Sequence, residues 1–437
     1  MAKTTTTTPR KLVELQYENL VANKDLSAEI EEAFGDYGLG ILTVSGVPGL
    51  EEKRRALLPL AHRFASLPPA LTKKYEHPQS FYSFGWSHGK ETLQHGRPDW
   101  LKGSFYANPL HDNPSTDQDL IDRYPAFLHP NIWPSKDVPA LESAFKDLGK
   151  LIVDVGAMVA KQCDVYVGSK CAGYANNGKV EKEGGKEGMG KLERVVRESR
   201  VCKGRLLHYF PYVAKEQEEE KGKEGKGTVC PKKEADEKDE EGGKKEMYFS
   251  TWCGWHNDHG SLTGLTSAMY LDVEGREVDV CSSTSSSASS NSEDDEEEED
   301  DGGLYALSRG GEVVKILLLP HQLAFQIGET AQIHSGGLLR ATPHAVKGST
   351  TRTKKGLSRE TFAVFMEPEM HEPMTMPEGR TVDDVCKKQG IMESDGGKEC
   401  EGREGGRVGV SVPSLASRWD PSIDFAEFTS RTLKSYY

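Results

Sequence analysis

The segment WHNDHGSLTGL at residues 255–265 carries a histidine and an aspartate two positions apart, His256 and Asp258. In an extended segment, residues i and i+2 point to the same side, so this imidazole and this carboxylate can converge on one metal ion. The pair alone is weak support for a metal site, because a chain with 13 histidines contains a His-x-Asp pair about once by chance. A polar turn before a strand is the alternative interpretation.

A third candidate ligand, His344, lies in a strand-like run, LLRATPHAV, at residues 338–346. Two histidines and one carboxylate occupy one face of a metal ion and leave the other face open. Non-haem iron(II) oxygenases use such an open face for O2 and a cosubstrate. The three residues together therefore predict an iron(II) centre.

Residues 358–365, SRETFAVF, form another expected strand, in which Arg359 and Thr361 share one face. A guanidinium can donate two parallel hydrogen bonds to a carboxylate, whereas a lysine acts as a point charge. Arg359 and the hydroxyl of Thr361 are therefore candidates for binding the distal carboxylate of a dicarboxylic acid. The alternative for Arg359 is a surface salt bridge.

Five further segments resemble the iron(II)- and 2-oxoglutarate-dependent dioxygenases of the isopenicillin N synthase-like class. The order and combination of these segments are more specific than any single motif, and the resemblance covers most of the chain outside its low-complexity stretches. The segments are EAFGDYGLGILTVSGVP at residues 32–48, FGWSHGKE at 84–91, NIWP at 131–134, RLLHYFP at 205–211 and QIGETAQIHSGG at 326–337.

The resemblance implies a mixed α/β fold, mainly β, with a double-stranded β-helix (jelly-roll) core flanked by helices. It also implies that His256, Asp258 and His344 are the metal ligands, since they match the family's ligand positions. Arg359 with Thr361 matches the family's Arg-x-Ser pair, which binds the cosubstrate.

Other positions bear on the cosubstrate and the substrate. His208 stands where plant relatives commonly have Asn, and the resemblance places it among the cosubstrate contacts. Phe210 stands where they commonly have a Tyr that touches the cosubstrate, so one hydroxyl contact is expected to be lost. Phe365 falls where relatives often place an aromatic side chain against the substrate. The stretch between His344 and Arg359 is longer than is usual in the family.

His259 directly follows Asp258 and is a competing candidate ligand. Adjacent residues of an extended segment point to opposite sides, so its side chain is expected to turn away from the ion. A role beside the ligands or at the surface is therefore favoured over ligation.

Hydrophobic periodicity indicates the elements that position these residues. Residues 24–64 predict a helix, a strand and a helix, and residues 139–163 carry the longest helical pattern. Six later segments are short, β-branched or aromatic, and bounded by turn residues, which predicts a β-barrel or sandwich. These segments are residues 205–212, 262–273, 313–319, 323–327, 338–346 and 361–366.

Stretches rich in Gly, Lys, Glu and Ser interrupt this pattern. They cannot bury enough apolar area to offset the entropy of ordering, so they are expected to be disordered loops on a folded core. The expected organisation is a flexible N-terminus at residues 1–23, an N-terminal helical/α+β region at 24–171, an insert at 172–199, a jelly-roll oxygenase domain at 200–377 interrupted at 214–246 and 274–303, an insert at 378–409 and a C-terminal segment at 410–437.

The composition argues against several classes of protein. The formal net charge of -14 and the absence of a clustered basic footprint argue against nucleic-acid binding. The 8 cysteines show no CxxC pairs, which argues against a zinc ribbon and favours reduced intracellular thiols. Residues 1–12 are Thr-rich and basic without an apolar core, so neither a secretory signal nor a membrane span is expected. These features predict a cytoplasmic protein that binds neither nucleic acid nor membrane.

The predicted function is the oxidation of a small organic substrate, by hydroxylation or desaturation, with Fe(II), 2-oxoglutarate and O2. Succinate and CO2 would be released. Two alternatives stay open. One is an iron oxidase of the same class that does not use 2-oxoglutarate, to which Phe210 gives some support. The other is a non-catalytic binding module on the same fold.

Overall fold

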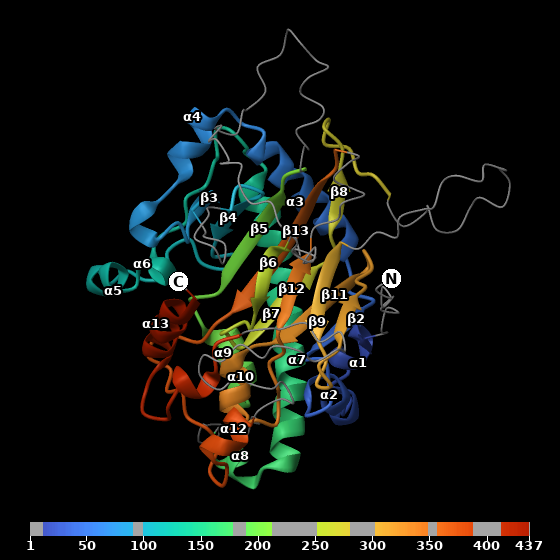
Figure 1. The fold of residues 1–437 in the computed structure, drawn as a ribbon, viewed down its shortest axis with the longest axis vertical. Helices are drawn as coiled ribbons and strands as arrows, with labels where there is room; N and C mark the ends of the chain where they lie inside the picture. The colour runs from blue at the N-terminus through green and yellow to red at the C-terminus, as the bar shows by residue number, and fades with distance from the viewer. Residues whose placement is uncertain are drawn as a thin grey trace, which may run out of the picture.

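The computed structural model describes residues 12–90, 99–177, 189–211, 251–279, 302–347, 356–387 and 412–436. Two β-sheets face each other, and helices cover the far side of the larger sheet (Figure 1). In the larger sheet, strands from the second half of the sequence lie between strands from the first half, so residues far apart in the chain lie side by side. This is a mixed α/β fold built on large sheets, as the sequence predicts.

The larger sheet has nine strands, in the order β1-β2-β11-β7-β13-β5-β4-β3, with β8 paired to β13. β13 lies inside it, because it pairs antiparallel with β5 on one side and with β7 and β8 on the other. The strands are β1 (Val13–Gln16), β2 (Ile41–Ser45), β3 (Gly85–His88), β4 (Lys102–Ala107), β5 (Lys203–Tyr209), β7 (Leu262–Thr266), β8 (Met269–Leu271), β11 (Gln322–Ile327) and β13 (Ser358–Met366).

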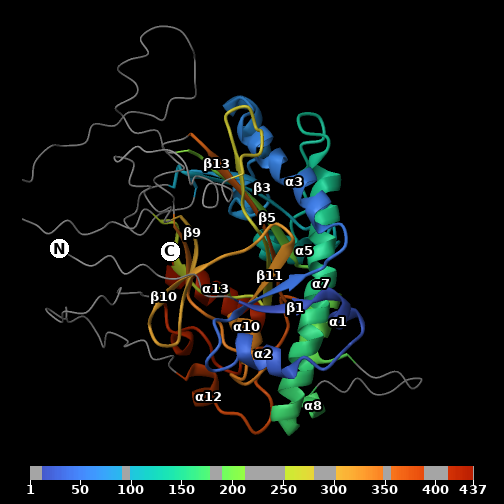
Figure 2. The ribbon, with the colours of Figure 1, turned by 90° about the vertical axis from the view of Figure 1, so that its right-hand side faces the viewer.

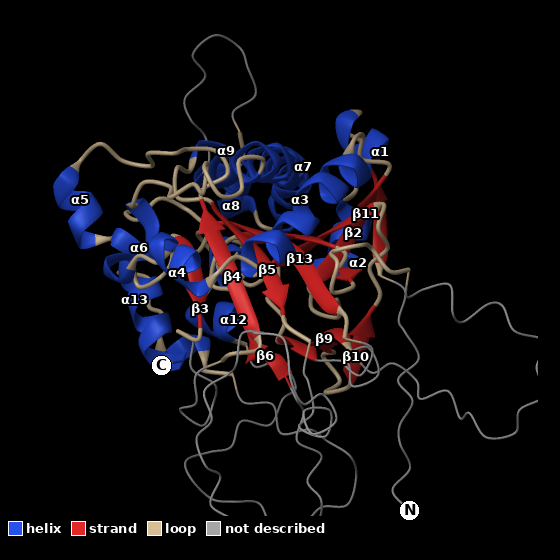
Figure 3. Cartoon of the chain, turned by 90° about the horizontal axis from the view of Figure 1, so that it is seen from above, coloured by secondary structure: helices blue, strands red, loops and turns tan. Residues whose placement is uncertain are grey.

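The smaller sheet has four strands, in the order β10 (Val313–Ile316), β9 (Gly303–Leu307), β12 (His344–Lys347) and β6 (Thr251–His256). It faces the larger sheet, as the view from above shows (Figure 3). Val314 clusters with Ala324 of β11, and Val346 packs on Leu207 and Tyr209 of β5. We call the side of the large sheet that faces the small sheet its inner face, and the opposite side its outer face.

Helices α3 (Leu50–Ala65) and α7 (Leu141–Lys170) cover the outer face (Figures 2 and 3). Phe145 of α7 packs edge-on against Phe362 of β13, with ring centroids 4.8 Å apart. Gly264 of β7 permits the close approach of α7, because a Cβ atom there would lie 2.2 Å from the side chain of Ile152. The other α-helices are α1 (Tyr17–Val21), α2 (Ser27–Phe34), α4 (Pro69–Thr72), α5 (Gln118–Arg123), α6 (Pro125–Leu128), α8 (Ala172–Asn177), α9 (Lys191–Glu198), α10 (Glu329–His334), α12 (Val382–Cys386) and α13 (Phe425–Tyr436).

The helix, strand and helix predicted for residues 24–64 are α2, β2 and α3, and the long helical pattern is α7. The predicted strand at residues 338–346 is shorter than expected, because only His344–Lys347 is extended. Gly336 and Gly337, both with positive φ, end α10 in a turn that continues into an irregular stretch before His344. Within the described ranges, no helix has the length and the apolar run that crossing a membrane requires.

Several segments expected to lack structure are ordered. In the predicted insert at 172–199, α9 buries Leu192, Val195 and Val196, which share one helical face, and packs on α7. The predicted flexible N-terminus contains β1 and α1, and the predicted insert at 378–409 contains α12, which begins with a capping box at Thr381. The insert at 214–246 and most of that at 274–303 lie outside the described residues.

Candidate metal centre

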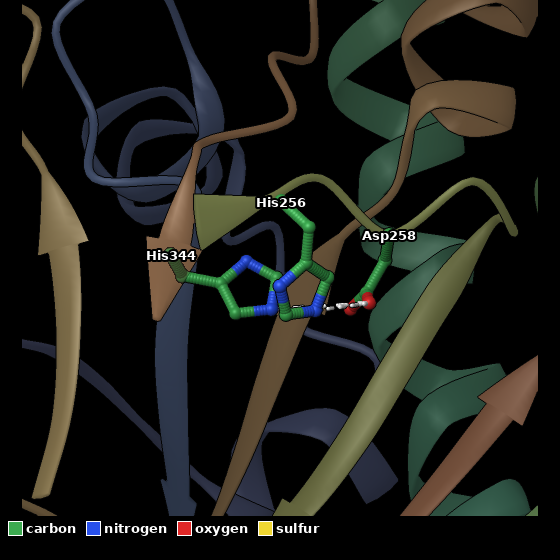
Figure 4. Close-up of side chains that lie close together, drawn as sticks. All are labelled: His256, Asp258 and His344. Atoms are coloured by element: carbon green, nitrogen blue, oxygen red, sulfur yellow. Dashed lines mark ion pairs between the residues drawn. The ribbon is translucent and has the colours of Figure 1, made fainter. Parts of the chain in front are cut away.

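Three side chains meet at the edge of the small sheet (Figure 4). His256 is the last residue of β6 and His344 the first residue of β12, and the two are direct partners across these strands. Their ring centroids are therefore only 4.2 Å apart. Asp258, in the loop after β6, lies with its Oδ1 atom 3.8 Å from Nε2 of each histidine. The potential ligand atoms all lie within 4.8 Å of one another, a spacing that one metal ion can bridge.

The other ring nitrogen of each histidine has a partner that fixes its orientation. Nδ1 of His256 lies 2.8 Å from the carbonyl oxygen of Gly254. Nδ1 of His344 lies 2.5 Å from the side-chain amide of Gln326 and 3.2 Å from the carbonyl oxygen of Thr342. With a hydrogen on Nδ1 donated to these neighbours, each Nε2 keeps its lone pair directed at the space beside Asp258.

The amide of Gln326 supports this tautomer. As placed, its nitrogen faces Nδ1 of His344, while its oxygen, buried among the described residues, has no hydrogen-bond partner. The two ends of a side-chain amide are assigned from their hydrogen bonds, so exchanging them is justified where it satisfies a buried atom. With the nitrogen and oxygen of this amide exchanged, the oxygen of Gln326 accepts a hydrogen bond from Nδ1 of His344.

The electrostatics suit a cation. Burial, together with the neighbouring His256, lowers the pKa of His344 to about 4, so this imidazole is neutral near pH 7. Burial alone would raise the pKa of Asp258, but His344 and His256 hold it below its ordinary value and keep the carboxylate ionised. Burial opposes protonation of His256, yet Cys253 and Asp258 raise its pKa to about 9. A metal ion would therefore displace a proton from His256.

The strand β13 carries the residues predicted to contact the cosubstrate and the substrate. Side chains alternate along β13, so Arg359, Thr361 and Phe365 share one face. Arg359 lies opposite Tyr209 of β5, which packs toward the small sheet, so this face is the inner one. The guanidinium of Arg359 lies 5.0 Å above the ring of Tyr209.

Both the sequence and the structure of the chain resemble those of known dioxygenases. Residues 12–136 match the family model of the N-terminal domain of non-haem dioxygenases in morphine synthesis. The structure resembles that of a protein from Caulobacter crescentus assigned to the 2OG-Fe(II) oxygenase family, with a TM-score of 0.56 and 16% identity over 99% of this chain and 100% of that chain. Residues 12–136 thus match the N-terminal domain of these dioxygenases, and the chain has the fold of the Caulobacter protein. The predicted resemblance is confirmed for this domain and for the fold.

A second structure similar to this chain is that of Neurospora crassa T7H in complex with alpha-KG and thymine. Its TM-score is 0.53, with 13% identity over 98% of this chain and 100% of that chain. No curated protein sequence matches the chain. At such identities the solved structures establish the fold of the chain and not its activity.

His208 is not brought to the inner face of the large sheet. It is the partner of Glu360 across β5 and β13, and its Nδ1 atom lies 2.9 Å from Oε1 of that residue. Its ring lies edge-on to His62 of α3, with centroids 5.7 Å apart, so it points to the outer face. Phe210 is also turned away, since its ring stacks on His88 and contacts His208. Tyr209, between these two residues, lies on the inner face, and it was not among the predicted cosubstrate contacts.

His259 lies beside the three candidate metal ligands but outside their group. Its Nε2 atom is 3.4 Å from Oε1 of Glu367, and its ring stacks on Phe425 of α13. Burial lowers the pKa of His259 to about 4 and raises that of Glu367 to about 7. The expected role beside the ligands or at the surface agrees with this placement, because its ring turns from the ligand atoms.

A buried ion pair, not anticipated from the sequence, holds the loop that carries Asp258. Glu329 of α10 accepts hydrogen bonds from both terminal nitrogens of Arg418, at 2.6 and 2.8 Å. The same carboxylate accepts from the side chain of Asn257, and the backbone nitrogen of Glu329 donates to the carbonyl oxygen of Asp258. The C-terminal segment thus contributes to the position of a candidate ligand.

Proposed function

We propose that this oxygenase uses Fe(II), 2-oxoglutarate and O2 to oxidise a small organic molecule, by hydroxylation or desaturation, with release of succinate and CO2. The observation that carries the proposal is the convergence of Nε2 of His256 and of His344 on one oxygen of Asp258, each at 3.8 Å. The finer fold proposed with it is a double-stranded β-helix, formed by the two facing sheets.

The donor set fits iron(II). Two neutral imidazoles and one carboxylate are the ligands of the facial triad, which leaves coordination positions open on the opposite side of the metal. The side chain of His256 is 30% exposed, whereas those of Asp258 and His344 are 7% and 9% exposed, so solvent reaches the group mainly at His256. Iron(II) held there supplies the activation of O2, and the protein supplies orientation and a site from which water is largely excluded.

Arg359 and Thr361 are proposed to bind the distal carboxylate of 2-oxoglutarate. Both are more than nine-tenths buried on the inner face, where a guanidinium and a hydroxyl can donate to a carboxylate with little competition from water. Tyr209, under the guanidinium, limits the positions that Arg359 can take. The crystal structure of Neurospora crassa T7H with alpha-KG supports this choice of cosubstrate, since that protein shares the fold.

Phe365 is proposed to contact the organic substrate, because it lies on the same face of β13 as Arg359 and is only partly buried. The stacking of Phe210 on His88, away from the inner face, weighs against the alternative without 2-oxoglutarate. The intact ligand set weighs against a non-catalytic module.

The test is anaerobic loading with Fe(II), followed by measurement of succinate released from 2-oxoglutarate on admission of O2. We expect His344→Ala to lose iron binding and succinate release, and Arg359→Ala to keep iron but bind 2-oxoglutarate at least about tenfold more weakly. Arg276→Ala is the matched control, because Arg276 is an exposed arginine paired with Asp272. Iron binding that survives in His344→Ala, or succinate release that Arg359→Ala leaves unchanged, would contradict the proposal.

A further inference from the structure

We infer that Glu360 and His208 form a positioning pair on the outer face of the sheet, which fixes the geometry of the 2-oxoglutarate-binding residues on its inner face. This inference rests on the proposed function of Arg359 and Thr361. It assigns a role to two polar residues that the proposed chemistry does not use. Neither touches the metal ligands, and both are almost fully enclosed.

The contacts within the pair are close. Nδ1 of His208 lies 2.9 and 3.0 Å from the two carboxylate oxygens of Glu360, and the hydroxyl of Ser358 donates to Oε1 of Glu360 at 2.7 Å. Glu360 is 0% exposed and His208 is 3% exposed. A buried carboxylate without such donors would be strongly unfavourable, so the three groups hold one arrangement.

The pair occupies the same rungs of the sheet as the proposed 2-oxoglutarate site. Glu360 lies between Arg359 and Thr361, and His208 lies between their strand partners Leu207 and Tyr209. Neighbouring residues of a strand point to opposite faces, so the backbone that carries Glu360 also sets the direction of Arg359 and Thr361. A bond between the side chains of Glu360 and His208 therefore fixes β13 against β5 at this level.

The pair is also held from the helix layer. The ring of His62 in α3 lies edge-on to that of His208, and a Cβ atom at Gly275 would lie 3.2 Å from Nδ1 of His62. Ser358, besides its bond to Glu360, lies opposite Leu271 of β8. Both members of the pair are thus enclosed by neighbouring residues of β8 and α3.

An ordinary outer-face position on these strands is apolar. Leu206 of β5 and Phe362 and Val364 of β13 are at most 1% exposed in the main core. The hydrogen-bonded pair of Glu360 and His208 replaces this packing beside Arg359, where a shift of one strand would move the guanidinium. A misplacement of about 1 Å at a binding group can cost a factor of about a hundred in catalysis.

The experiment compares 2-oxoglutarate binding with iron binding in anaerobic Fe(II)-loaded protein, by calorimetric titration. We expect His208→Leu and Glu360→Gln to raise the dissociation constant of 2-oxoglutarate roughly ten- to hundredfold, the range for partners that orient a binding group. Iron affinity should stay near that of the wild type, because neither residue contacts His256, Asp258 or His344. His208→Asn should largely restore 2-oxoglutarate binding, since its amide can donate to Glu360.

Asp164→Asn is the matched control for a general loss of stability. Asp164 is a buried carboxylate whose acceptor bonds come from Tyr174 and from the backbone nitrogens of Leu192 and Glu193. Equal weakening of 2-oxoglutarate binding by Asp164→Asn would overturn the inference, as would unchanged binding in both His208→Leu and Glu360→Gln while Arg359→Ala loses it. Failure of iron-loaded wild type to bind 2-oxoglutarate would instead refute the proposed function, and the inference with it.

Discussion

The two faces of the large sheet are built from alternate residues of the same strands, yet they differ in what they contribute. On β13, Phe362 and Val364 on the outer face are 0% exposed and pack in the helix layer. Arg359 and Thr361 on the inner face lie on the side of the small sheet, which carries His256 and His344. Two neighbouring residues of a strand therefore lie on opposite faces, one packed against the helices and the other facing the small sheet.

Two buried aspartates, one in the helix layer and one among the candidate metal ligands, differ in their pKa values. Asp164, in the helix layer, and Asp258, at the metal centre, are 9% and 8% exposed. Burial raises the pKa of Asp164 to about 6, even though Tyr174 and two backbone nitrogens donate to it. Two imidazoles hold the pKa of Asp258 below its ordinary value despite similar burial. The partners of a buried carboxylate, and not its burial alone, decide whether it is charged.

The largest effect on stability is expected from removing an outer-face ring. Phe362→Ala should lower the free energy of unfolding by about 3 to 5 kcal/mol, because it leaves a cavity against Phe145 of α7. Phe365→Ala is the matched control on the inner face of the same strand, where the ring is only partly buried. Urea denaturation of the two variants measures the difference. An equal loss of stability in both variants would show that the two faces of β13 contribute equally to the packing of the core.

A smaller effect is expected from pH in the helix layer. The pKa of about 6 for Asp164 in the folded protein lies above the ordinary value of 3.8, so folding favours the protonated form. Its stabilising contribution is full below about pH 3.8 and is lost as the pH rises through 6, by on the order of 2 to 3 kcal/mol.

The check is the free energy of unfolding of wild type and Asp164→Asn at pH 5 and pH 7.5. Other titrating groups contribute to both proteins, so the difference between the two isolates Asp164. The advantage of the wild type over Asp164→Asn should shrink as the pH rises. An advantage that grows with pH would mean that the carboxylate is stabilised in its charged form, as at Asp258.

The elements that depend on local periodicity could be predicted from the sequence. The stripe of apolar residues in α7 and the buried run of β2 are local patterns, and both elements are present. His256, Asp258 and His344 could be identified as candidates because their residue types and order match a ligand pattern. α9 escaped prediction because its short apolar face, with Leu192 and Val195, lies next to a low-complexity stretch.

The face on which a strand residue lies could not be read from residue types alone. His208 and Tyr209 are adjacent, and a match to family positions could not show which of them turns toward the metal. Alternation counted forward from Leu207 would have indicated Tyr209 once the inner face was known. The bond between Glu329 and Arg418 joins residues 89 positions apart, and no local pattern signals such a contact.

The smallest effect on stability, and the sharpest contrast with Phe362, is expected at the residue directly before it, Thr361. Thr361→Val removes a hydroxyl and keeps the shape of the side chain, so the free energy of unfolding should stay within about 1 kcal/mol of the wild type. The dissociation constant of 2-oxoglutarate should rise about tenfold, because a hydrogen bond to a charged carboxylate contributes about 1.5 kcal/mol. Thr361→Ser, which keeps the hydroxyl, should bind 2-oxoglutarate nearly as well as the wild type, and calorimetric titration of the iron-loaded variants measures both. A Thr361→Val protein that binds 2-oxoglutarate normally but loses several kcal/mol of stability would place Thr361 in the packing layer, and the division of β13 into two faces would then fail at the residue where it matters most.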